Sequence, residues 1–135
     1  MPKAIPFEKK FKVENDVIDH FNHVNNIAYV QWVLGISKDH WISFSSEKIR
    51  NQFGWMIMKH NLNYIRQAKL NDELNIKTWI HDFSTATSTR KTTISEVNTQ
   101  KVIFESQAKW CFVNLKTQKP TRLTSDILNP FFESL

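Results

Sequence analysis

The sequence predicts an α+β fold in which one long central helix is wrapped by a single curved antiparallel sheet. Three observations support this prediction. Residues 7–14 alternate apolar and charged side chains as a strand does, residues 27–41 space their apolar side chains as a helix does, and the period becomes two over much of residues 54–115. One buried helix with several antiparallel strands is an α+β arrangement. With 135 residues we expect one domain, covering residues 1–135.

The first strand and the helix are placed by their spacing. The strand is FEKKFKVE, residues 7–14, and the helix begins near Asn26. Either Asn25 or Asn26 can cap the helix, because its side-chain oxygen can accept from the free amides of the first turn. Gly35 lies inside the helix at a cost of about 1 kcal/mol relative to alanine, which suggests close packing there. We expect one face of the helix to hold Ile27, Val30, Leu34 and Trp41, with Tyr29, Val33 and Ile36 beside it.

Four more strands are predicted, at residues 54–68, 71–83, 87–98 and 102–115. The first of these has blurred alternation, as in a strand covered on both faces. The other three alternate more regularly, and turns are expected at Asn71-Asp72 and at Asn98-Thr99-Gln100. The C-terminal stretch SDILNPFFESL predicts a short helix that Ser125 caps and Pro130 interrupts.

Composition excludes several classes of function. Only Gly35 and Gly54 are present, so a glycine-rich phosphate loop cannot be built. Cys111 is the one cysteine, which excludes an intramolecular disulfide, and we interpret it as a buried apolar residue. The first ten residues lack the apolar core of a signal peptide, and no run is long enough to span a membrane, so a cytoplasmic protein is expected. The net charge of +5 suits an anionic partner, but the lysines are scattered.

The most informative segment is DVIDHFNHVNNIAYV, residues 16–30, at the predicted helix start. It contains two acids, two histidines and three asparagines, whereas capping needs only one such residue. This concentration of polar side chains indicates either an unusually polar loop or a functional site. Asp19, His20 and His23 do not have the spacing of a zinc site, so no metal is expected.

The order of motifs resembles a known family. Residues 19–33, D-HFN-HVNN-IAY-VQWV, join an acid to HVNN, an aromatic residue and an apolar helix. This pattern resembles hotdog-fold thioesterases of the 4-hydroxybenzoyl-CoA thioesterase and acyl-carrier-protein thioesterase type. LNYIRQAKLNDELNIKTWI looks like the family's strand-turn-strand, and AKWCFVNLKTQKPTRLTSDI looks like its last strand and tail. The resemblance covers most of the chain and implies a hotdog domain that hydrolyses an acyl-CoA or acyl-carrier-protein (ACP) thioester.

The resemblance also implies catalytic roles. Asp19 matches the family's acid and would act as general base toward water or as nucleophile. His23 would hold the water or the thioester oxygen and orient Asp19. Amides near Asn25 and Asn26 would stabilise the oxyanion at the helix start. No cofactor is implied, since coenzyme A or phosphopantetheine enters only as part of the substrate.

Residues that contact the substrate are harder to identify. Trp55, Met56 and Met58 are our candidates for an acyl tunnel between helix and sheet. In one subfamily an arginine-rich stretch holds the coenzyme A phosphates, but residues 84–86 replace it here, so Arg90 and Lys91 are the nearby candidates. Phe21 makes the loop more apolar, which could raise the pKa of Asp19 or change the pocket.

The departures from the family pattern leave other functions open. One is an enoyl-thioester hydratase with the same fold, and another is a non-catalytic module that binds acyl thioesters or acidic proteins. A nucleic-acid binder ranks third and a membrane partner is not expected. Because the edge strands of an open sheet need cover, we expect a homo-oligomer, either a dimer or a tetramer.

Overall fold

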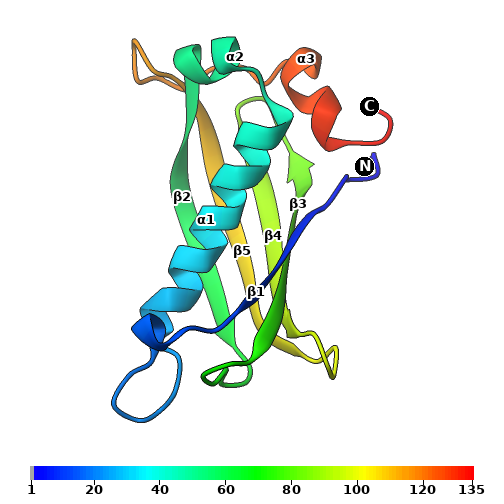
Figure 1. The fold of residues 1–135 in the computed structure, drawn as a ribbon. Helices are drawn as coiled ribbons and strands as arrows, with labels where there is room; N and C mark the ends of the chain where they lie inside the picture. Colours follow the sequence, from blue (N-terminus) through cyan, green and yellow to red (C-terminus); the bar gives the residue numbers. More distant parts are fainter. Residues whose placement is uncertain (1) are drawn as a thin grey trace.

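The computed structural model describes residues 2–135, which form a five-stranded antiparallel sheet curled around one long helix (Figure 1). The strand order across the sheet is β1-β3-β4-β5-β2. The strands are β1 (Phe7–Lys12), β2 (Phe53–Tyr64), β3 (Glu73–Phe83), β4 (Thr87–Glu96) and β5 (Val102–Asn114). The helices are α1 (Asn26–Phe44), α2 (Glu47–Gln52) and α3 (Ser125–Leu128), with 3-10 turns η1 (Asn15–Val17) and η2 (Asn129–Phe131). The α+β fold expected from the sequence is confirmed.

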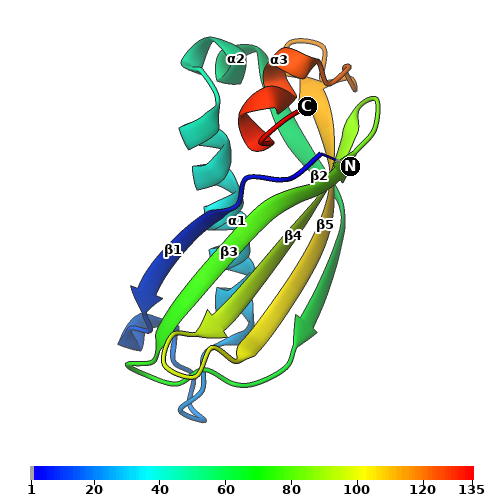
Figure 2. The ribbon, with the colours of Figure 1, turned by 90° about the vertical axis from the view of Figure 1, so that its right-hand side faces the viewer.

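The helix α1 covers one face of the sheet, and the opposite face is open (Figure 2). On β3 the side chains of Leu74, Ile76, Thr78 and Ile80 are all buried, as their alternation predicted. The matching row on β4 consists of Ser88, Arg90, Thr92 and Ile94, and is also buried. Three of those four side chains are polar, which is unusual for a face beneath a helix. Within residues 2–135 no helix is both long and apolar enough to cross a membrane.

The strand β2 differs from its expected environment. Its blurred apolar pattern suggested cover on both faces, but β2 lies at an edge of the sheet and pairs only with β5. Several of its apolar side chains are exposed, with Met58 at 58%. The strand also ends at Tyr64 instead of residue 68. The apolar pattern therefore marks a surface without cover in this chain.

The buried face of α1 is shifted from the predicted one, although Tyr29, Val33 and Ile36, which were expected beside that face, are buried. Ile27 is 63% exposed and Leu34 is 38% exposed, whereas Ala28, Tyr29, Val33, Ile36, Ser37 and His40 are buried. The buried row contains two polar residues, Ser37 and His40, so it is less apolar than the neighbouring row. For this reason the apolar pattern of the sequence favoured the neighbouring row. Asn25 is the cap, because its Oδ1 accepts from the amide of Ile27 at 2.8 Å.

The environment of Gly35 corrects another expectation. Apart from the adjacent residues and the backbone of α1 itself, a methyl group placed at Gly35 would meet no atom of residues 2–135 within 4 Å, so close packing does not explain the glycine. Gly35→Ala should raise the free energy of unfolding by about 1 kcal/mol, because alanine has the higher helix propensity. Urea denaturation followed by circular dichroism would measure the change. Lower stability would contradict this and show that another chain packs against this surface.

The C-terminal segment closes one end of the sheet. Ile127, Leu128, Phe131 and Phe132 are buried there. Phe132 pairs with Ala4 in an isolated bridge, which brings the two chain ends together, as Figure 1 shows. The cap of α3 is Thr124 and not Ser125, and Thr124 makes no side-chain capping bond. Pro130 is the second residue of the turn η2, in its first turn, where proline is accommodated.

Candidate active site

Backbone hydrogen bonds join the two ends of the loop that precedes α1. The amide of Asp19 donates to the carbonyl of His23 at 2.8 Å, and the amide of Asn25 donates to that of Val17 at 2.8 Å. Asn22, between them, takes a positive φ of 64°, a conformation that asparagine tolerates better than most residues. Val24 anchors the loop on the core, where it is buried. Residues 19–24 therefore form a defined loop that presents its side chains beside the helix start.

Asp19 is held by one of its two carboxylate oxygens. Its Oδ1 accepts from the amide of Phe21 at 2.9 Å and from the amide of His23 at 3.2 Å. Oδ2 accepts no hydrogen bond from residues 2–135, so it is free to meet a substrate or a water. Partial desolvation acts to raise the pKa of Asp19, but these two amides and the His20 and His23 rings outweigh it, and the pKa lies below its ordinary value. The carboxylate is therefore ionised at neutral pH.

The other side chains of the loop do less than expected. The orientation of Asp19 comes from backbone amides, because the His23 ring makes no hydrogen bond within residues 2–135. Phe21 is 68% exposed and packs against His20, with ring centroids 4.1 Å apart. The pKa of Asp19 is nevertheless lowered, so the increase that an apolar loop could cause is outweighed. His23 as a residue is half-buried.

The start of α1 offers one free amide. The amide of Ile27 donates to the Asn25 side chain, the amide of Ala28 donates to the Asn25 carbonyl at 2.9 Å, and Asn25's own amide is taken by Val17. Within residues 2–135 the amide of Asn26 has no acceptor. The helix dipole adds positive potential at this point, so an oxyanion would be stabilised here. Of the two residues expected to supply amides, Asn26 remains available and Asn25 serves as the cap.

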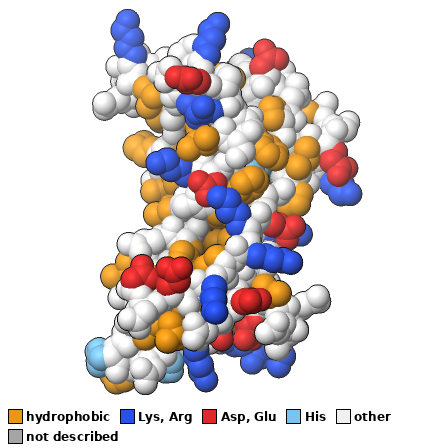
Figure 3. All heavy atoms as spheres, in the orientation of Figure 1, with side chains coloured by type: hydrophobic (Ala, Val, Ile, Leu, Met, Phe, Trp, Pro, Cys, Tyr) orange, Lys and Arg blue, Asp and Glu red, His pale blue; other side chains and the backbone are white. Residues whose placement is uncertain are grey.

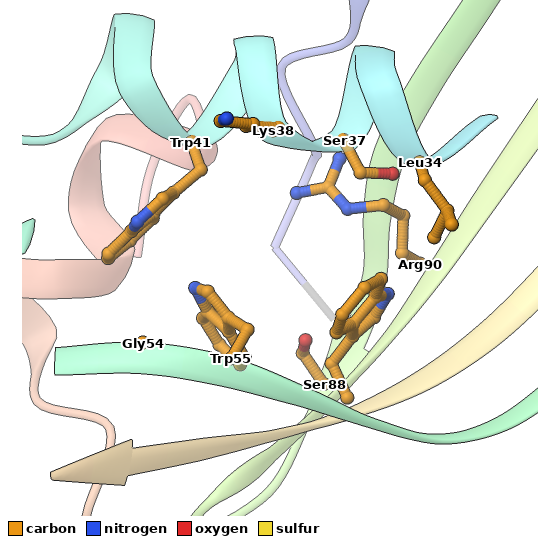
Figure 4. Close-up of a pocket in the computed structure, with 9 residues that line it drawn as sticks. Leu34, Ser37, Lys38, Trp41, Gly54, Trp55, Ser88 and Arg90 are labelled. Atoms are coloured by element: carbon orange, nitrogen blue, oxygen red, sulfur yellow. The ribbon is translucent and has the colours of Figure 1, made fainter. Parts of the chain in front are cut away.

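A cavity of about 260 Å³ lies farther along α1, between the helix and the sheet (Figure 4). Its lining combines aromatic, hydroxyl and cationic side chains: Leu34, Ser37, Lys38, Trp41, Gly54, Trp55, Ser88, Arg90 and Trp110. Asp19 and His23 are not among them. Within one chain the structure therefore separates the loop from the cavity.

The predicted substrate-binding residues are divided between several surfaces. Trp55 and Arg90 line the cavity. Met56 and Met58 are exposed on β2 and do not line it. Lys91 is on the open face of the sheet, in a separate hollow with Trp79. Arg90 is buried, so it does not present a surface cation to the phosphates of coenzyme A.

Several cavity residues were missed by sequence reasoning. His40 supports the cavity from α1, because its Nδ1 receives a hydrogen bond from Arg90 Nη1 at 2.9 Å. Ser37 and Trp41 are on the same helix, and Trp110 lies on β5. The available signal was a serine and a histidine three residues apart on an otherwise apolar helix row. Within residues 2–135 no group of three or more His, Cys, Asp or Glu side chains is arranged to hold a metal ion.

Comparison with known proteins places the chain in a family. No curated protein sequence matches it. Among solved structures, the probable thioesterase YbaW from Escherichia coli is 22% identical with a TM-score of 0.82, covering 91% of this chain and 94% of that one. Slr0204, a 1,4-dihydroxy-2-naphthoyl-CoA thioesterase from Synechocystis, is 16% identical with a TM-score of 0.79, covering 93% and 94%.

A plant enzyme extends the likeness. The 12:0-ACP thioesterase from Umbellularia californica is 10% identical with a TM-score of 0.81, and the match covers 96% of this chain but 52% of that one. These likenesses show that the chain has the hotdog fold. Residues 5–131 match the family described as acyl-ACP thioesterase N-terminal domain. The chain therefore belongs to the acyl-ACP thioesterase family, whose general chemistry is thioester hydrolysis.

Proposed function

We propose that the protein hydrolyses an acyl thioester of coenzyme A or of ACP at the loop that precedes α1. The observation that carries this proposal is that two groups of the loop and the helix start have no partner within residues 2–135: Asp19 Oδ2, on an ionised carboxylate, and the amide of Asn26. A carboxylate and an oxyanion donor are the two groups that thioester hydrolysis needs. Family membership supports the same reaction.

The reaction balances with water as the second substrate and without a cofactor. Either Asp19 takes a proton from water as the water oxygen attacks the carbonyl carbon, or Asp19 attacks the carbon itself and water hydrolyses the resulting anhydride. In both routes the carbonyl oxygen becomes an oxyanion near the amide of Asn26. Collapse of this oxyanion breaks the carbon–sulfur bond, and the thiolate leaves and is protonated; in the second route this step forms the anhydride, which water then hydrolyses. The products are a free acid and a thiol.

Thiol release from a panel of acyl-CoA and acyl-ACP esters tests the proposal. Wild-type protein should release thiol with stoichiometric free acid. A hydratase would add water to an enoyl ester and release no thiol. Absence of thiol from every ester of both carriers would overturn the proposal.

The pH dependence should reflect the low pKa of Asp19. Because the folded-state pKa lies below its ordinary value of 3.8, the carboxylate and any stability that it confers are present above that value. Both are lost only as the pH falls through the lower folded-state pKa. We expect kcat/KM to stay constant on the acid side of neutrality down to about pH 4, as far as the protein stays folded. A fall between about pH 5 and 7 would contradict this and point to a histidine.

We further propose that the active form is at least a dimer, formed through β2. The opposite edge strand, β1, is protected by exposed charges at Glu8, Lys9 and Lys10, which disfavour edge pairing. On β2 the exposed apolar side chains are Met56, Ile57, Met58, Leu62 and Tyr64. Figure 3 shows hydrophobic side chains along the left-hand edge, where β2 lies. Such a patch is typical of an interface.

A dimer of this kind would connect the loop and the cavity. Antiparallel pairing about the middle of β2 sets Trp55 of one copy near Leu62 and Tyr64 of the other. The Tyr64 hydroxyl donates to the carbonyl of Asn26 at 3.0 Å, so this end of β2 lies at the helix start. The cavity of one copy would then open beside the catalytic loop of the other. This arrangement accounts for a loop and a cavity that are separate within one chain.

A single charge introduced on β2 tests whether the dimer forms there. Met58→Lys places an ammonium in the middle of the exposed β2 patch, and we expect it to convert a dimer into a monomer. Light scattering would report the mass. Lys59→Met changes the neighbouring residue in the opposite sense and should leave the dimer intact. A wild-type monomer, or a Met58→Lys dimer, would contradict the arrangement.

A further inference from the structure

Arg90 is a buried cation without a counter-ion. Its side chain is 8% exposed, on the face of β4 beneath α1. Within residues 2–135 the ion pairs are Lys3–Glu133 and Lys9–Asp39, and neither involves Arg90. Its partners are neutral: Nη1 donates to His40 Nδ1 at 2.9 Å and to Thr78 Oγ1 at 3.1 Å. A buried charge normally has an opposite charge beside it, because desolvation is costly otherwise.

His40 is neutral and does not compensate the positive charge of Arg90. Because its Nδ1 accepts from Arg90, its proton lies on Nε2. Burial and the adjacent Arg90 lower the pKa of His40 to about 3, so the ring stays neutral. Burial lowers the pKa of Arg90 to about 10, so the guanidinium stays charged at neutral pH. The site therefore carries one uncompensated positive charge.

The unsatisfied charge faces the cavity. Both hydrogen bonds that Arg90 makes within residues 2–135 use Nη1, which leaves Nε and Nη2 without a protein acceptor. Figure 4 shows the side chain reaching from the sheet toward α1, with its guanidinium beside Ser37. Trp110, which also lines the cavity, has a buried Nε1 without a hydrogen-bond partner. A buried indole N–H usually has one.

The remaining lining defines what would fit. Trp41, Trp55 and Trp110 provide aromatic walls, while Ser37, Ser88 and Lys38 add further donors. None of the lining residues is acidic. A cavity of roughly 150 Å³ can hold benzene, so 260 Å³ takes a short chain or a substituted ring. The cavity is therefore apolar along its walls, rich in donors at one side, and positively charged.

We propose that this cavity binds the far end of an acyl group that ends in a carboxylate, with Arg90 as its counter-ion. The inference rests on the proposed thioesterase function and names its substrate class: mono-thioesters of dicarboxylic acids. The carboxylate occupies the free N–H groups of Arg90 and is within the reach of the Trp110 indole N–H. The methylene or aromatic part lies against the tryptophans.

Binding can be measured without any hydrolysis. Since three tryptophans line the cavity, intrinsic fluorescence should report its occupancy. Wild-type protein is titrated with matched pairs in which a methyl ester stands in for the thioester end, so that only one member of each pair carries a carboxylate: monomethyl adipate with methyl hexanoate, monomethyl suberate with methyl octanoate, and monomethyl sebacate with methyl decanoate. We expect at least one diacid monoester to bind about 10- to 100-fold more tightly than the neutral ester of its pair, the range for a charged hydrogen bond. Equal affinity in every pair would overturn the inference.

Variants then assign the preference to Arg90. Arg90→Met keeps the length of the side chain and removes the charge, and should bind both members of a pair equally. Lys109→Met removes one charge from an exposed position on β5 outside the cavity and should keep the wild-type preference. Arg90→Met leaves the buried His40 Nδ1 without its donor, so its melting temperature is measured beside that of wild type to show that the variant folds. Should it fail to fold, Arg90→Lys provides the comparison, with the charge kept but the planar fork lost.

The corresponding CoA esters separate failure of this inference from failure of the proposed function. If suberyl-CoA is hydrolysed faster than octanoyl-CoA and Arg90→Met reverses the order, both stand. If wild type prefers the member of a pair that carries the terminal carboxylate and Arg90→Met does not, but no thioester releases thiol, the cavity assignment stands and the hydrolase proposal fails. If esters are hydrolysed with no preference for a terminal carboxylate in wild type, the hydrolase proposal stands and the cavity assignment fails.

Discussion

Replacing Asp19 with asparagine should lower kcat/KM by about 100-fold or more, the loss expected for a general base or nucleophile. Asparagine keeps an oxygen that can accept from the amides of Phe21 and His23, so the loop should retain its shape. What the variant removes is the negative charge and the free Oδ2. The fall should therefore appear in kcat with little change in melting temperature. Thiol release under steady-state conditions measures it.

The matched control for this variant is Asp16→Asn. Asp16 lies in η1, is exposed, and makes no side-chain hydrogen bond within residues 2–135. It carries the same charge only three residues away from Asp19. We expect Asp16→Asn to keep wild-type kcat/KM. A similar loss in both variants would attribute the effect to the general electrostatics of the loop, and an active Asp19→Asn would exclude the carboxylate from the chemistry.

The fold was largely accessible from the sequence because period and capping are local signals. The alternation of β3 needed only its own residues, and Asn25 caps α1 through a contact with Ile27, two positions away. The face of α1 was less accessible, since the row that is buried is the less apolar of the two candidate rows. Only the packed structure shows that the row with His40 is buried, and that His40 is there because Arg90 from β4 donates to it.

The loop was accessible for a different reason than the cavity. Asp19 and His23 belong to one short segment, so their types and order are visible together in the sequence. The cavity joins α1, β2, β4 and β5, residues that are up to about 75 positions apart, and no local pattern brings Leu34 and Trp110 together. Arg90 was selected as a surface cation for phosphates, and its burial follows from the strand register, which only the sheet reveals.

Asn26→Pro should be nearly as damaging as the loss of Asp19, with a fall in kcat of about 100- to 1,000-fold, the usual range for an oxyanion donor. Asn26 is the first residue of α1, where proline is well tolerated because that amide has no partner within the helix. The ψ of Asn25 is 133°, which falls in the extended range that a following proline requires. The variant thus deletes one N–H while preserving the helix.

Asn26→Ala is the control that separates the amide from the side chain. Alanine keeps the backbone N–H and removes the carboxamide, so kcat should stay near the wild-type value. Melting temperatures of both variants should match wild type. If Asn26→Ala loses as much activity as Asn26→Pro, the side chain is the donor; if Asn26→Pro remains active, the oxyanion is stabilised elsewhere.

Combining Asn26→Pro with Asp19→Asn tests whether the two groups act on the same transition state. Asp19 would start the attack on one side of the thioester carbonyl, while the amide of Asn26 would receive the charge that this attack creates on the oxygen. Without attack there is little charge to stabilise, so the double variant should lose less than the product of the two single losses. Independent, multiplicative losses would mean that the loop and the helix start contribute to different steps, such as chemistry and binding.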